Sequence, residues 1–110
     1  MANEKLKGEA KNEALGIALF NVGLSFYKRG FYDSAFDCLI KALNGCTQNE
    51  KGQNQCLKFI DLSIDEILKD GNPRTISKES LDMYMNVLDE ISNDKTIKIK
   101  KFILTNLSES

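Results

Sequence analysis

The sequence predicts an all-α protein, a small antiparallel bundle of about five helices. Apolar residues recur at helical spacing along most of the 110 residues, and the alternation typical of strands is almost absent. One strong breaker cluster, Gly71-Asn72-Pro73, interrupts this pattern. Because 42% of the residues are apolar and the length suits one core, residues 1–110 are expected to form a single helical domain.

The first two helices are predicted to form an antiparallel hairpin. The first runs from about Asn3 to Lys28, and Gly30 then suits a left-handed cap. Asp33 is expected to cap a second helix that ends near Cys46.

Two further helices are expected at about residues 50–70 and 77–92. Thr47 and Glu50 fit a capping box for the third helix, and Gly71 is expected to end it. Ser77 is placed to cap the fourth helix.

The last predicted helix covers about residues 94–108, with Ile99, Phe102, Ile103 and Leu107 on one face. Its segment TIKIKK also alternates, which leaves a short strand open. Helix is preferred because the sequence shows no second strand to satisfy the backbone hydrogen bonds of the first.

Charge and hydropathy argue against nucleic acid and membranes as partners. The formal net charge is −1, and the basic and acidic residues are interspersed. The start of the chain lacks an apolar leader segment, and no run approaches the roughly 18 apolar residues of a membrane span. A soluble cytoplasmic protein is expected.

The sequence also lacks the usual signs of an enzyme. It contains no histidine, the commonest general base near neutral pH and the commonest metal ligand. It shows no Gly-rich phosphate loop, HExxH-like motif or nucleophile elbow. Cys38, Cys46 and Cys56 lack CxxC spacing and are expected to be reduced, small apolar residues. No catalytic residue, cofactor or metal is therefore predicted.

Residues 16–49, GIALFNVGLSFYKRGFYDSAFDCLIKALNGCTQN, resemble a tetratricopeptide repeat. The residues that carry the resemblance are Leu19, Val22, Gly23, Phe26, Gly30, Tyr32, Ala35, Leu39 and Ala42. Gly23 and Ala35 are expected to let the two helices approach closely. The repeat occurs once, so the rest of the chain or a partner must complete its core.

A second resemblance, to the microtubule-interacting and trafficking (MIT) domain, rests on GFYDSAFDCLIKAL and the long third helix. Such a domain would be complete by Gly71 and would bind partner helices. The tetratricopeptide resemblance is preferred because of Gly23.

The tetratricopeptide resemblance implies that the first helix lines a concave binding face. The residues implied are Ile17, Phe20, Leu24, Tyr27 and Lys28. Four of the five are apolar, which favours an apolar or amphipathic protein segment as ligand. Two alternatives remain: helices three to five cover Phe20 and Leu24 in a closed bundle, or part of the face is open to a partner or a second copy.

The expected function is a non-enzymatic protein-binding module, a small adaptor or chaperone-like protein. The alternatives are a structural subunit or homo-oligomer of a larger assembly, or an MIT-like helix-binding domain. The lysines of the last helix are expected to form a solvated face, with an acidic partner or nucleic acid as the alternative. Lys58 and Lys69 are placed to pair across one turn with Asp61 or Asp65.

Overall fold

The computed structural model describes the backbone of residues 2–46, 49–71, 74–91 and 93–109, and the side chains in these ranges from residue 13 onward. Five helices form the bundle: α1 (Ala2–Lys28), α2 (Tyr32–Asn44), α3 (Glu50–Asp70), α4 (Lys78–Asp89) and α5 (Lys95–Asn106). Two short strands, β1 (Arg74–Ile76) and β2 (Leu107–Glu109), accompany them. The predicted all-α fold is confirmed.

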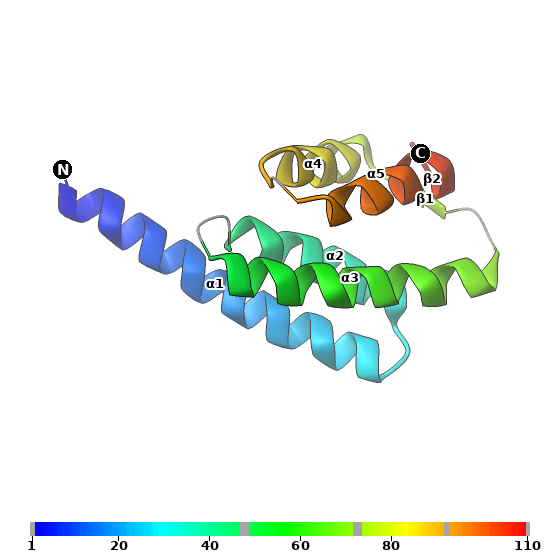
Figure 1. The fold of residues 1–110 in the computed structure, drawn as a ribbon, viewed down its shortest axis with the longest axis horizontal. Coiled ribbons are helices and arrows are strands. Elements are labelled where there is room, and N and C mark those ends of the chain that lie inside the picture. Colours follow the sequence, from blue (N-terminus) through cyan, green and yellow to red (C-terminus); the bar gives the residue numbers. More distant parts are fainter. Residues whose placement is uncertain (1, 47–48, 72–73, 92, 110) are drawn as a thin grey trace.

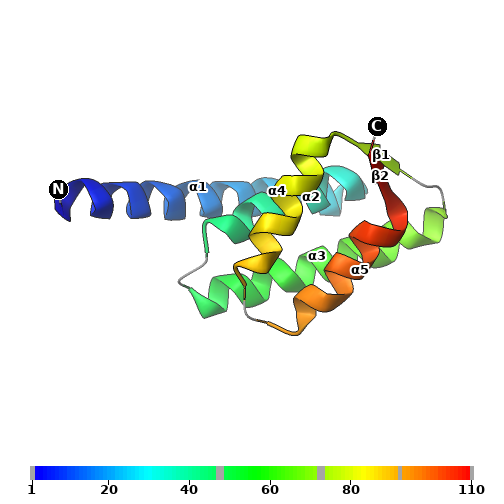
Figure 2. The same ribbon diagram turned by 90° about the horizontal axis from the view of Figure 1, so that it is seen from above.

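The helices lie in three layers, with α2 and α3 in the middle (Figures 1 and 2). α1 covers one side of this middle layer, while α4 and α5 cover the other. The amino-terminal half of α1 projects beyond the bundle, so the radius of gyration is 14.0 Å. A compact domain of this length would have about 13 Å.

The α1–α2 turn forms at the predicted glycine. Gly30 has a φ of +84°, and the amide of Phe31 donates a hydrogen bond of 3.0 Å to the carbonyl of Phe26. This six-to-one bond satisfies a carbonyl at the helix end and reverses the chain.

α2 begins without the predicted cap. Phe31 occupies the cap position and offers no side-chain hydrogen bond. The expectation that Asp33 caps this helix was wrong: Asp33 lies in the first turn and pairs with Arg74 of β1. Arg74 also reaches Asp70 at the end of α3, at 2.9 Å, so the guanidinium of Arg74 links β1 to both α2 and α3.

Small residues on α1 allow α2 to approach closely. A Cβ at Gly23 would lie 2.9 Å from the Cγ of Leu39, so the nearest neighbour is one turn beyond the expected Ala35. A Cβ at Gly16 would lie 3.2 Å from the carbonyl oxygen of Ala42. The hairpin is therefore closest where α1 has no side chain.

The core lies between α2, α3, α4 and α5. Phe36 of α2 makes edge-to-face contacts with Tyr84 of α4 and Phe102 of α5, each with 5.4 Å between ring centroids. No apolar side chain of α1 among residues 13–28 is fully buried; instead Leu19, Phe20, Phe26 and Tyr27 pack against the core half-buried. The closed alternative forms only in part: α3 contacts α1 through Phe59, whereas α4 and α5 lie on the other side of α2 and α3.

Two of the three later helix signals act as predicted. The side chain of Ser77 caps α4 by accepting from the amide of Ser80 at 3.1 Å, and Gly71 ends α3 with a φ of +76°. Asn49 caps α3 by accepting from the amide of Gly52 at 3.0 Å. The predicted cap residue Thr47 lies outside the described residues.

The chain ends in a strand where helix was expected. TIKIKK is helical as predicted, but α5 stops at Asn106, and Leu107 adopts extended backbone. β2 pairs with β1 in parallel, with Leu107 opposite Arg74. The predicted helix to residue 108 was therefore too long, because β1 supplies a hydrogen-bonding partner 33 residues earlier in the chain.

The lysines of α5 are not one solvated face. Lys98 pairs with both Asp61 and Asp65 of α3, and Lys100 pairs with Asp89 of α4 at 2.6 Å. These pairs connect α5 to both neighbouring helices.

The pairs expected within α3 were correspondingly wrong. Lys69 contacts Glu66 at 2.8 Å. Lys58 lies 5.6 Å from the centre of the Phe59 ring, a cation–π contact. Lys98 pairs with Asp61 and Asp65 instead, and Lys58 forms no ion pair in the described part of the chain.

Candidate partner-binding groove

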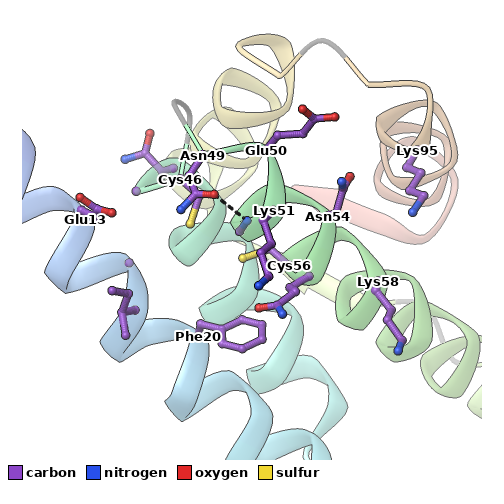
Figure 3. A pocket seen from close by; sticks show the side chains of 16 residues that line it. Glu13, Phe20, Cys46, Asn49, Glu50, Lys51, Asn54, Cys56, Lys58 and Lys95 are labelled. Atoms are coloured by element: carbon purple, nitrogen blue, oxygen red, sulfur yellow. Dashed lines mark hydrogen bonds between the residues drawn. The ribbon is translucent and has the colours of Figure 1, made fainter.

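An open groove of about 1280 Å³ runs between α1 and the amino-terminal half of α3 (Figure 3). We call it the α1–α3 groove. The α2–α3 junction forms its floor. Its lining comprises Glu13, Gly16, Ile17 and Phe20 of α1; Asn44, Gly45, Cys46 and Asn49 of the junction; Glu50, Lys51, Gly52, Asn54, Gln55, Cys56 and Lys58 of α3; and Lys95 of α5.

Glycines form part of the groove lining. Gly16, Gly45 and Gly52 carry no side chain into the space between the helices. A Cβ at Gly52 would lie 3.2 Å from the sulfur of Cys46. Larger residues at these positions would therefore both fill the groove and crowd its floor.

Aromatic rings border the groove where α1 and α3 meet. The ring of Phe59 lies edge-to-face against Phe20, at 6.0 Å between centroids, and against Tyr27, at 5.9 Å. Tyr27 in turn contacts Tyr32 at 5.5 Å. α3 thus covers part of the face that the sequence assigned to binding.

The predicted binding residues divide into two sets. Ile17, with 57% of its surface exposed, and the half-buried Phe20 line the groove. Leu24 and Tyr27 are half-buried, Lys28 is exposed, and all three lie outside the lining. The structure therefore brings two of the five predicted residues to one site.

The wall that α3 contributes was not predicted from the sequence. Lys51 and Lys58 are separated by seven residues, a spacing that places both on one face of a helix. This signal could have found them, but the repeat-like pattern ends at residue 49 and supplies no template beyond it.

The thiols in the floor behave as apolar groups. Burial, together with the neighbouring Cys46 thiol, raises the pKa of Cys56 to about 12. Burial also raises the pKa of Cys46 and of Cys38. All three cysteines are free, and near neutral pH they carry no charge.

The charges at the rim are unevenly distributed. Lys51 and Lys58 on α3 and Lys95 at the start of α5 stand on one side, while Glu13 stands on α1 (Figure 3). None of the three lysines forms an ion pair with a carboxylate in the described part of the chain. Glu50, at the start of α3, also lines the groove, so the lining holds three lysines against two glutamates and carries a small excess of positive charge.

Other apolar side chains are exposed outside the groove. Leu15 and Val22 of α1 and Phe31 of the following turn form no part of its lining. Ile97 and Leu104 project from α5 and are 67% and 71% exposed. These positions offer matched controls for substitutions in the groove.

Within the residues that the structure describes, no group of three or more histidine, cysteine, aspartate or glutamate side chains is arranged to hold a metal ion. None of the described helices combines the length and the apolar character needed to cross a membrane.

Comparison with protein-family models, with curated proteins and with solved structures finds no match to this chain. The tetratricopeptide and MIT resemblances remain predictions that rest on the residues alone.

Proposed function

We propose that this protein is a non-enzymatic interaction module, a small adaptor or chaperone-like protein that binds an apolar or amphipathic segment of a partner protein in the α1–α3 groove. One observation carries the proposal: Ile17, more than half exposed, and Phe20 line an open groove large enough for side chains of a partner. Pockets of several hundred cubic ångströms lined by apolar groups are typical of binding sites.

The energetics of burial support this proposal. Burying an exposed apolar side chain stabilises a complex by roughly 1.5–3 kcal/mol. Among the side chains that line the groove, Ile17 would contribute most to this stabilisation. Burial of the exposed part of Phe20 would add to it. Two such anchors, with the uncharged thiols of Cys46 and Cys56 beneath them, favour an apolar ligand surface.

The tetratricopeptide resemblance is kept as part of the proposal. In that interpretation the α1–α2 hairpin is the repeat, and α3 to α5 complete its core. The edge-to-face contacts of Phe36 with Tyr84 and Phe102 favour this over an MIT-like unit complete by Gly71, because residues 1–71 alone would expose Phe36. We also propose a cytoplasmic location, since three free thiols suit a reducing compartment.

A structural subunit or homo-oligomer is the second candidate. Leu15, Val22 and Phe31, outside the groove, give it a specific basis because each is exposed. In that case sedimentation velocity would show a dimer that Leu15→Asp dissociates. A monomer over a wide concentration range would exclude self-association as the function.

Peptide selection tests the proposal directly. A displayed random-peptide library is selected on the wild-type protein, and enriched peptides are measured against Ile17→Asp and the matched control Ile97→Asp. Both isoleucines are exposed, so both variants should stay folded. We expect apolar or amphipathic peptides whose binding is lost in Ile17→Asp alone. Failure to enrich any peptide that depends on Ile17 would contradict the proposal.

A further inference from the structure

The charge of the groove selects among amphipathic ligands. Lys51 and Lys58 are seven residues apart on α3, about 10 Å along the helix axis. They therefore lie on the same wall of the groove, about two helical turns apart. Lys95 adds a third cation from α5. All three border the groove, and none is neutralised by a carboxylate in the described part of the chain.

The contrast with the neighbouring lysines is informative. Lys98 and Lys100, close to Lys95 in sequence, are each paired with aspartates on other helices. Among the described side chains, Glu13 of α1 and Glu50 at the start of α3 are the acidic members of the lining, against three lysines. Lys98 and Lys100 thus hold α5 in place through ion pairs, whereas the three lysines beside the groove form no ion pair in the described part of the chain.

The floor favours a helical ligand over an extended one. Asn44, Asn49, Asn54 and Gln55 supply amide side chains to other parts of the lining, but Ile17, Phe20 and the two protonated thiols form an apolar part with no strong hydrogen-bonding partner for a ligand backbone. An extended segment would bury peptide groups without partners there, whereas a helix satisfies its own. The walls from Glu13 to Phe20 and from Lys51 to Lys58 are each about two helical turns long.

We propose that the ligand of the α1–α3 groove is an amphipathic helix with an acidic edge, its apolar face on Ile17 and Phe20 and its carboxylates along Lys51, Lys58 and Lys95. This inference rests on the function proposed above and adds the chemistry of the partner. Complementary charge at a rim fixes the orientation of a bound helix and favours acidic over basic partners.

Three synthetic helices provide the probe. Each has about 18 residues, enough to sustain helix, with the same leucine face and with glutamate, glutamine or lysine along one edge. Their affinities for the wild-type protein, for Lys51→Glu/Lys58→Glu and for Ile17→Asp are measured by fluorescence anisotropy at low salt. Circular dichroism confirms that the variants keep their helix content.

The expected order on the wild type is glutamate, then glutamine, then lysine. Each solvent-exposed ion pair at the rim is weak alone, but several together should make the affinity of the glutamate helix at least about tenfold higher than that of the lysine helix. Lys51→Glu/Lys58→Glu should reverse this order, and Ile17→Asp should weaken all three helices. Added salt should reduce the separation.

The alternative results separate the two proposals. Equal affinity of the three helices, with binding lost in Ile17→Asp, would overturn the acidic-edge inference while leaving the groove as a binding site. Affinities that are unchanged by Ile17→Asp and by the lysine substitutions would overturn both proposals.

Discussion

The two sides of the α2–α3 layer are built differently, although both face helices of the same chain. On the α4–α5 side, Phe36, Leu88, Ile99 and Ile103 are buried almost completely. On the α1 side, the closest approaches occur at glycines, and the neighbouring apolar side chains stay half-buried or exposed. One side therefore resembles the interior of a domain, and the other a surface that still has apolar area to bury.

Similar apolar patterns in the sequence therefore lead to different degrees of burial in the fold. Residues 17–27 are apolar almost all round, a pattern typical of a helix that is buried on every side. The structure instead places Ile17 beside a groove and Val22 on the outside. Stability should thus come chiefly from the α4–α5 side, and binding from the α1 side.

The largest difference in the free energy of unfolding is expected between substitutions of two isoleucines, one buried and one exposed. Ile60 of α3 is fully buried, so Ile60→Ala should destabilise the fold by about 2–5 kcal/mol through lost burial and a cavity. Ile17→Ala should cost less than about 1 kcal/mol because more than half of Ile17 is exposed. Urea unfolding of both variants measures this, and similar costs would break the comparison.

Next in size is the polar contact between α4 and α2. The hydroxyl of Tyr84 donates a hydrogen bond of 2.6 Å to Asp37, and Tyr84→Phe should cost about 1.5 kcal/mol because the acceptor is charged. Asp37 also pairs with Lys41 at 2.8 Å, which limits the loss. Thermal unfolding of the wild type and Tyr84→Phe at neutral pH measures this loss as a lower midpoint for the variant. An unchanged midpoint would mean that the hydrogen bond contributes nothing.

The same tyrosine should make stability fall at high pH. Burial first, and then the bond to Asp37, raise the pKa of Tyr84 above its ordinary value of 10.0. The protonated form is therefore favoured in the folded state, and its contribution is complete below about pH 10, then lost as pH rises towards the folded-state pKa. Urea titrations between pH 8 and 11 should show a steeper decline for the wild type than for Tyr84→Phe; parallel curves would contradict the assignment.

A smaller effect is expected at the α1–α2 contact. Gly23→Ala places a methyl group 2.9 Å from Leu39, and overpacking of this kind costs about 1–3 kcal/mol. A gain in helix propensity of up to about 1 kcal/mol offsets part of this cost. A double-mutant cycle with Leu39→Ala should show coupling; strictly additive effects would mean that the two positions do not touch.

The smallest effect should come from the ion pairs of α5. Lys98 is about half exposed, so Lys98→Ala should lose less than about 1 kcal/mol despite its two aspartate partners. The loss should shrink further in 0.5 M salt. A larger, salt-independent loss would show that Lys98 contributes through packing.

The features predicted correctly from the sequence are those that neighbouring residues decide. Gly30 and Gly71 end helices because their left-handed backbone suits glycine, and Ser77 caps α4 through an amide three residues away. Ile17 and Phe20, which the tetratricopeptide resemblance implied as binding residues, both line the α1–α3 groove.

The features missed depend on partners far away in the chain. Leu107 is extended because it pairs with Arg74, and Asp33 is engaged by that same arginine. Lys98 of α5 pairs with Asp61 and Asp65 of α3, the two carboxylates that the sequence assigned to Lys58 and Lys69. Local patterns contain no information about these pairings.

A titration followed by two-dimensional amide NMR tests the central claim most directly, because glycine amides resolve well. The helix with the glutamate edge is added to the labelled protein. Shifts should concentrate at Gly16, Gly45 and Gly52, with Gly30 and Gly71 unmoved. Shifts confined to α4 and α5, or none at the groove glycines while the peptide binds, would contradict the account.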